Sequence, residues 1–156
     1  MAKKNLNNDY VKETIIFLLR IALGWLFFYA GVEKLMNPEW TASGFLLNAK
    51  TFHDLYASFA SAGNIGWVNS IVPWGEISIG LGLIFGTFTR LASYFAILLL
   101  ALFYFPGLDF PHVKNGFIVD EKVIYMLVFA ALIYVRAGTI WGLDYFINKK
   151  VQNWFV

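Results

Sequence analysis

The chain has 156 residues and a net charge of only +2, a size that favours a single domain. Hydrophobic residues make up 59% of it and charged residues 14%, so a soluble protein this small could not cover its apolar surface, and the composition predicts lipid as its solvent. The scattered basic residues exclude a nucleic-acid-binding stripe, and the absence of cysteine excludes disulfides, thiolate metal sites and thiol redox chemistry on this chain.

Four apolar stretches predict membrane-spanning helices. The first covers residues 14–34, after a polar stretch at 1–13 that we expect to be a solvated arm. A signal peptide is the competing interpretation of this first stretch, but it is longer than an ordinary signal-peptide core and no small-residue cleavage pattern follows it. The other spans are expected at residues 67–86, 91–107 and 121–141.

Two polar loops separate these spans. In the first, the aromatic and aliphatic residues of Thr51–Ala60 recur three and four positions apart, which favours a short amphipathic helix on the membrane surface over a plain loop with buried aromatics. The second loop runs from Pro106 to Val119, and Asp120 is a plausible N-cap for the span that follows. The fold class is therefore expected to be all-α: a four-helix membrane bundle formed by a single domain over residues 1–156, with one short outer helix.

The basic residues predict the orientation. With both termini on one side, that side holds eight lysines and arginines and the other holds four. Positive residues concentrate on the cytoplasmic side, so we expect both termini to be cytoplasmic and both longer loops to face outward.

Glu76 is the most informative residue, because it lies well inside the second span. A charge near mid-membrane costs roughly 3 kcal/mol or more, so Glu76 should face the bundle interior and meet a polar group of another span. We expect that group to be one of four: Glu33, Tyr104, Glu121 or Tyr125. Either a proton-handling role or a purely structural hydrogen bond would explain such a carboxyl.

Glu33 ends the first span at the same outer level as Glu121, and Tyr29 lies one helical turn from Glu33. Together with Glu76 and the nearby His112, these residues are what a proton-coupled quinone pocket, or a cation site, would need. Lys34 is interpreted as an interfacial lysine whose ammonium reaches the headgroups. Trp40, in the loop after the first span, is a candidate cap for the pocket. No metal site is predicted.

Arginines and small residues mark the inner half. Arg20 shares a stripe with Gly24 and Gly31, so we expect it to point into the bundle, and Arg90 and Asp144 lie at the inner boundary as a candidate structural pair. A separate stripe recurs every fourth residue and indicates close helix packing. It consists of Ser78, Gly82 and Gly86.

Several motifs together resemble the DoxX/DoxD family of membrane proteins. The run from Arg20 to Lys34 resembles the opening of that family, and the run from Glu76 to Arg90 resembles its second span and turn. Residues 37–44, Asn-Pro-Glu-Trp-Thr-Ala-Ser-Gly, resemble the DoxD branch in particular. Leu102–Tyr104 and Gly138–Asp144 match the closing signatures.

This resemblance implies a four-helix membrane protein and a role as the membrane subunit of a quinone-linked oxidoreductase, as in thiosulfate:quinone oxidoreductase. Glu33 and Glu76 would then handle protons, and quinone would be the substrate. The pocket candidates are Tyr29, Trp40, Tyr104, Glu121, Arg20 and Arg90. The alternative is a non-catalytic membrane anchor that assembles redox or stress-response proteins. Candidate partners besides the lipid bilayer are a second oxidoreductase subunit and further copies of the chain.

Overall fold

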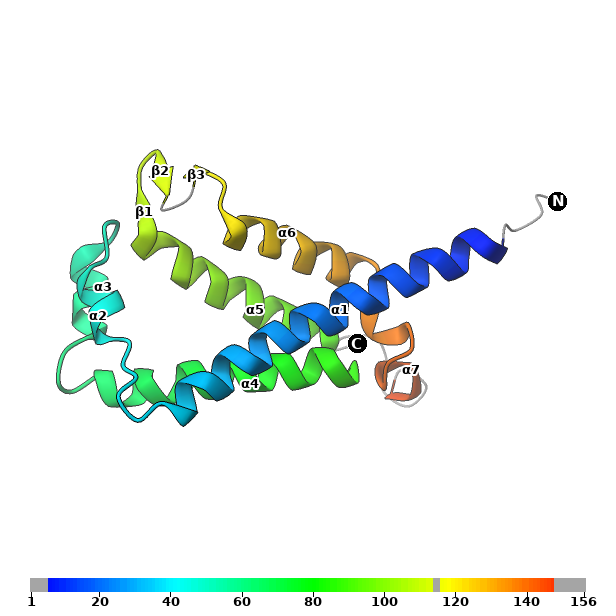
Figure 1. The fold of residues 1–156 in the computed structure, drawn as a ribbon, viewed down its shortest axis with the longest axis horizontal. Coiled ribbons are helices and arrows are strands. Elements are labelled where there is room, and N and C mark those ends of the chain that lie inside the picture. Colours follow the sequence, from blue (N-terminus) through cyan, green and yellow to red (C-terminus); the bar gives the residue numbers. More distant parts are fainter. Residues whose placement is uncertain (1–5, 114–115, 148–156) are drawn as a thin grey trace.

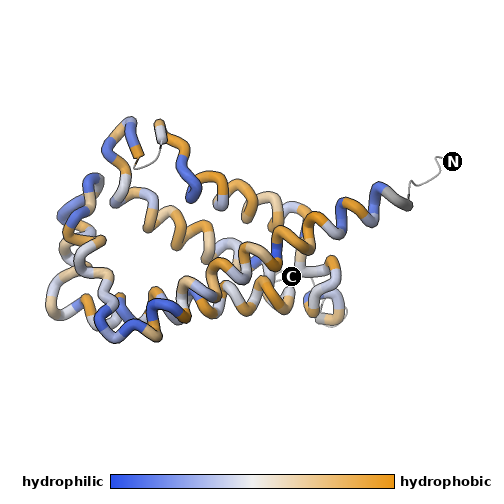
Figure 2. The backbone as a smooth tube through the Cα atoms, viewed as in Figure 1, coloured by the Kyte–Doolittle hydropathy of each residue, from blue (hydrophilic) through white to orange (hydrophobic). Residues whose placement is uncertain are grey.

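The computed structural model describes residues 6–113 and 116–147, and its helices run roughly side by side (Figure 1). In this part of the chain three helices are long and apolar enough to cross a membrane. They are α1 (Leu6–Met36), α4 (Ile65–Phe85), and α5 (Thr89–Tyr104), which the 3₁₀ turn η1 (Phe105–Gly107) prolongs. Apolar residues follow these helices along their length, and polar residues gather at their ends (Figure 2).

The first helix begins earlier than expected. Residues 1–13 are predicted to be a solvated arm, yet α1 already starts at Leu6. No glycine or proline interrupts residues 6–13, and Asp9 in the first turn complements the positive end of the helix dipole.

The fourth expected span is the main correction to the fold. The helix α6 covers only Glu121–Tyr134, 14 residues, whereas 121–141 is the sequence-based prediction. At 1.5 Å per residue it is about 21 Å long, shorter than a hydrocarbon core of roughly 30 Å. The start is as predicted, because the Asp120 carboxylate accepts from the backbone amides of Lys122 and Val123.

The early end of α6 is explained by a buried arginine on α1. Arg136 adopts a left-handed conformation with φ 52°, and the 3₁₀ turn η2 (Ala137–Thr139) follows. These turns take Ala137 and Ile140 out of the α-helix, and the Ala137 carbonyl accepts the Ile140 amide at 3.2 Å within the turn. The Arg20 guanidinium donates to the carbonyls of Ala137 at 2.6 Å and Ile140 at 2.9 Å. A continuous helix would have used these carbonyls internally.

The two loops are more structured than expected. The predicted outer helix at 51–60 is present as α3 (His53–Phe59), and the structure adds α2 (Ser43–Leu47) before it. The loop at 106–119 forms a small antiparallel sheet, so the fold is mostly helical and not all-α. The sheet has the order β1 (Leu108–Asp109), β2 (His112–Val113) and β3 (Gly116–Phe117). A last short helix, α7 (Asp144–Ile147), lies at the same end as the start of α1 (Figure 1).

The helices are arranged as two pairs, α1 with α4 and α5 with α6, and contact between α4 and α5 is thinner. The first pair packs through glycines. A Cβ atom added at Gly80 would lie 2.5 Å from the Phe28 amide nitrogen and 2.7 Å from the Gly24 carbonyl oxygen. Gly31 makes the same kind of backbone contact against Pro73. Small residues of this kind let membrane helices approach closely.

We therefore expect Gly80→Ala to destabilise the α1–α4 pair. The added methyl group meets backbone atoms of α1, which cannot rotate away, and overpacking of this kind costs about 1–3 kcal/mol. Gly66→Ala, in the same helix but with open space around the added Cβ, is the matched control and should be neutral or slightly stabilising. Thermal unfolding in one detergent compares them. Equal melting temperatures would contradict the packing account.

Candidate functional site

A large apolar groove lies between α4 and α5. Its volume is ≈ 1180 Å³, and nearly all of its lining atoms belong to apolar side chains. A drug-sized ligand or the tail of a lipid fits a space of this size. Because the two helix pairs meet only loosely along this line, the groove follows directly from the pairing of α1 with α4 and of α5 with α6.

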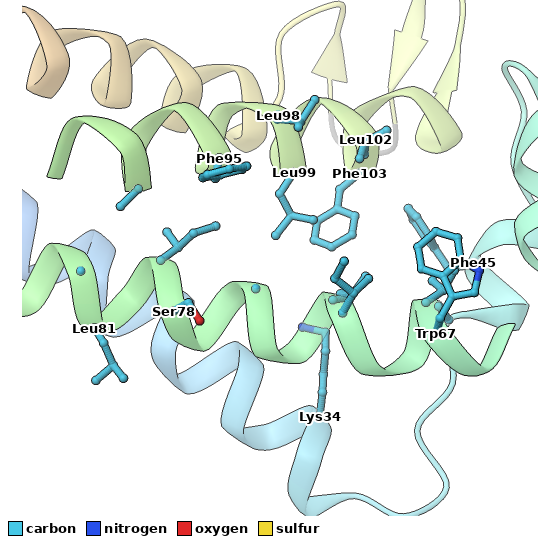
Figure 3. Close-up of a pocket in the computed structure, with 18 of the residues that line it drawn as sticks. Lys34, Phe45, Trp67, Ser78, Leu81, Phe95, Leu98, Leu99, Leu102 and Phe103 are labelled. Atoms are coloured by element: carbon cyan, nitrogen blue, oxygen red, sulfur yellow. The ribbon is translucent and has the colours of Figure 1, made fainter. Parts of the chain in front are cut away.

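Both walls of the groove carry large apolar side chains. On α4 these include Trp67, Ile71 and Leu81, with the small residues Gly75, Ser78 and Gly82 between them. Figure 3 shows Leu99 and Phe103 extending from α5 into the gap.

The stripe of Ser78, Gly82 and Gly86 packs closely at its two glycines. A Cβ atom added at Gly82 would lie 3.3 Å from the Ala92 Cβ of α5, and one added at Gly86 would lie 2.7 Å from the Gly142 Cα. Ser78 and Gly82 also line the groove, and Gly86, with φ 66°, ends α4.

The groove has an open side with exposed apolar side chains. Ile71, Phe95 and Leu98 line it and are each more than half exposed. In a membrane such side chains contact lipid, so a molecule dissolved in the bilayer enters sideways without crossing water.

One end of the groove is closed by α2 and α3. Trp40, Phe45 and Trp67 lie here, and Tyr56 is buried among them, 4% exposed. The Tyr56 hydroxyl donates to the Leu102 carbonyl of α5 at 3.1 Å. Burial raises the pKa of the Tyr56 phenol, so it stays a neutral donor and ties this cap to α5 through the physiological pH range.

A buried ion pair lies on the α1–α4 side of the groove. The Lys34 ammonium donates to both oxygens of the Glu76 carboxylate, at 2.7 Å and 3.0 Å, and to the Ala30 carbonyl at 3.2 Å. Glu76 is only 3% exposed, and Lys34 lies between it and the groove. The Trp40 ring centroid is 5.8 Å from the ammonium nitrogen, within the range of a cation–π contact.

This pair confirms one expectation and corrects another. Glu76 does face the interior and does meet a polar group from another helix. The partner is Lys34, however, and not one of the four residues expected. Lys34 turns inward because leaving Glu76 unpaired in hydrocarbon would cost more than desolvating both groups of a well-formed pair.

A second buried charge centre lies at the opposite end of the bundle. Arg20 is fully buried, as its stripe predicts. The Asp144 carboxylate is also buried and accepts from the backbone amides of Phe88 and Thr89, at 2.7 Å and 2.9 Å, which caps the start of α5. The expected Arg90–Asp144 pair is not formed among the described residues, because both Asp144 oxygens bind these amides and Arg20 is the cation that acts on it.

The other predicted site residues do not converge on the groove. Tyr29, Glu33 and Glu121 are exposed, and the Tyr104 hydroxyl donates to the Ile118 carbonyl beside the small sheet. His112 is exposed in β2. No group of three acidic or histidine side chains suited to a metal occurs in the described chain. Of the predicted pocket residues, only Trp40 lines the groove, while Glu76 lies behind Lys34.

The groove-lining aromatics and Lys34 are what the sequence interpretation missed. Only one signal points to Lys34: Glu76 needs a cation, and Lys34 is the basic residue that the first span places at its outer end. Nothing in the sequence distinguishes Phe95 and Phe103, which line the groove, from ordinary lipid-facing residues of the third span.

Comparison with known proteins places this architecture in a family. The DoxX family model matches residues 15–106, more than half of the chain, and this range contains both Lys34 and Glu76. No solved structure was found that matches the chain.

The Lys34–Glu76 ion pair should contribute measurably to the stability of the fold. Lys34→Met leaves Glu76 buried without a partner, so we expect it to lower the free energy of unfolding by roughly 3 kcal/mol. The double variant Lys34→Met/Glu76→Leu should recover most of this loss, because replacing both members of a buried pair by apolar groups is often close to neutral. Melting temperatures in one detergent report both. A double variant no more stable than the single one would contradict the pairing.

Proposed function

The chain belongs to the DoxX family, and on this premise we propose that it is the membrane subunit of a quinone-linked oxidoreductase. The observation that carries the proposal is the apolar groove between α4 and α5 with a charged pair at its wall. A lipid-soluble quinone needs an apolar channel for its tail and a polar group for its head, and the groove offers both.

Electrons have to come from another protein in this proposal. Reduction of a quinone to a quinol takes two electrons and two protons, and the chain carries no cysteine that could act as a thiol donor. A second subunit is therefore part of the proposal. Thiosulfate as the ultimate electron donor is its narrower form, and the support for it is the resemblance of residues 37–44 to the DoxD branch.

The proposal includes four crossings of the membrane with both termini cytoplasmic. Although α6 is short, Arg20 of α1 binds the carbonyls that follow α6, and Asp144 binds the start of α5. These contacts put the end of α6 at the end of the bundle opposite the sheet of β1, β2 and β3. A tilt of the short helix, or local thinning of the bilayer, accommodates its length.

Because the chain has no cysteine, single cysteines test this topology. We expect a membrane-impermeant maleimide to label His112→Cys in intact cells, and to label Lys12→Cys and Arg136→Cys only after permeabilisation. All three positions are exposed. Labelling of Arg136→Cys from outside would mean that α6 does not cross, and labelling of Lys12→Cys from outside would invert the orientation.

Quinone binding itself is tested by filling the groove. Gly75 lines it, and a Cβ atom added there meets nothing within 4 Å, so Gly75→Leu should occupy the groove without disturbing the fold. We expect it to reduce binding of decyl-1,4-benzoquinone at least tenfold, measured by native mass spectrometry from detergent micelles.

The matched control is Gly66→Leu, which also has open space and lies in the same helix but does not line the groove. It should bind the quinone as the unmodified chain does. Equal binding by Gly75→Leu and the unmodified chain would contradict a site in the groove. Failure of the unmodified chain to bind any quinone would favour the alternative role as a non-catalytic membrane anchor.

A further inference from the structure

Of the Lys34–Glu76 pair, Lys34 is the member that meets an occupant of the groove. Lys122 also lines the groove, but it lies in the first turn of α6 and its ammonium is paired with the Asp120 carboxylate at 3.1 Å. Lys34 lines the groove, whereas the carboxylate of Glu76 lies behind it. The side chain of Lys34 is 21% exposed and that of Glu76 is 4% exposed. In Figure 3, the Lys34 side chain extends from α1 across α4, and its nitrogen lies at the level of the α4 backbone, on the way to the gap.

The ammonium has a hydrogen bond that it can redirect. Two of its three protons bind the Glu76 carboxylate, and the third binds the Ala30 carbonyl at 3.2 Å, the longest of the three contacts. The Ala30 carbonyl already accepts the backbone amide of Lys34 within the helix, so it loses little when this proton turns toward a ligand. Glu76 meanwhile holds the nitrogen at the wall.

An ammonium in this position selects ligands by the chemistry of their polar head group. The lysine ammonium donates hydrogen bonds and accepts none, so it favours binding of a ligand whose oxygen accepts a hydrogen bond. The Trp40 ring beside the ammonium offers an aromatic face to a flat head. A quinone ring, with a carbonyl oxygen at its edge and an apolar tail, satisfies both conditions.

We infer that Lys34 is the residue that makes the groove specific for quinones, by donating a hydrogen bond to one quinone carbonyl, and that Glu76 is the positioning residue that fixes the Lys34 ammonium at the groove wall. This inference rests on the proposed function and deepens it, because it names the atom that recognises the head and the end of the groove where the head lies.

Two ligands that differ only in the carbonyl oxygens test the inference. Decyl-1,4-benzoquinone and decylbenzene share tail and ring, and native mass spectrometry of the chain with both present gives the ratio of the two bound forms. A hydrogen bond from a charged donor favours the quinone by on the order of ten- to hundredfold. We expect that preference in the unmodified chain. In the double variant Lys34→Met/Glu76→Leu we expect the ratio to fall to near unity, because the donor is removed while the groove stays apolar and the chain still folds.

Two further variants separate the role of the Lys34 charge from that of Glu76. Lys34→Arg retains a cationic donor and should keep most of the preference, whereas Glu76→Leu releases the Lys34 side chain toward water and should lose it. Because the readout is a ratio within the folded population, a loss of stability alone does not move it. An unchanged preference in the double variant overturns the inference while quinone binding, and the proposed function, stand. Absence of quinone binding to the unmodified chain overturns both.

Discussion

A charge inside hydrocarbon needs a partner, and the two places where this chain meets that requirement determine much of its architecture. At one end of the bundle, Arg20 takes backbone carbonyls as its partners, and α6 ends early to supply them. Midway along α4, Glu76 takes Lys34, which lies in the last turn of α1, and the pair joins the two helices. Burying either charge without these contacts would cost several kilocalories per mole.

The groove follows from how the remaining surfaces pair. Gly80 of α4, with Gly24 and Gly31 of α1, brings the two helices into backbone contact, so that pair is tight. On its opposite face α4 meets α5 closely at Gly82, beside Ala92, and the groove lies along the rest of this contact. Asp144 holds the start of α5, and Tyr56 holds its far end. Large side chains of α5 face the space that is left.

Much of the fold is predictable from sequence, because hydropathy, turns and caps are local properties. The starts of α4 and α6, the Asp120 cap and the helix at 53–59 all follow from neighbouring residues. The end of α6 does not, because it depends on Arg20, more than a hundred residues away. The site divides in the same way. The cost of burying Glu76 is readable from its place in a span, but the choice of Lys34 as partner depends on the register of α1 against α4. The spacing of small residues likewise cannot say which face packs and which one stays open.

The central claim is that the groove holds a quinone at the Lys34–Glu76 pair. It is tested most directly by identifying the lipids and quinones that copurify with the protein from its own membrane. The chain is purified in mild detergent, extracted with organic solvent, and its quinones and phospholipids are quantified by mass spectrometry. The account predicts about one quinone per chain, enriched well above the quinone-to-phospholipid ratio of the source membrane. A ratio equal to that of the membrane would contradict it, since the groove would then hold ordinary lipid.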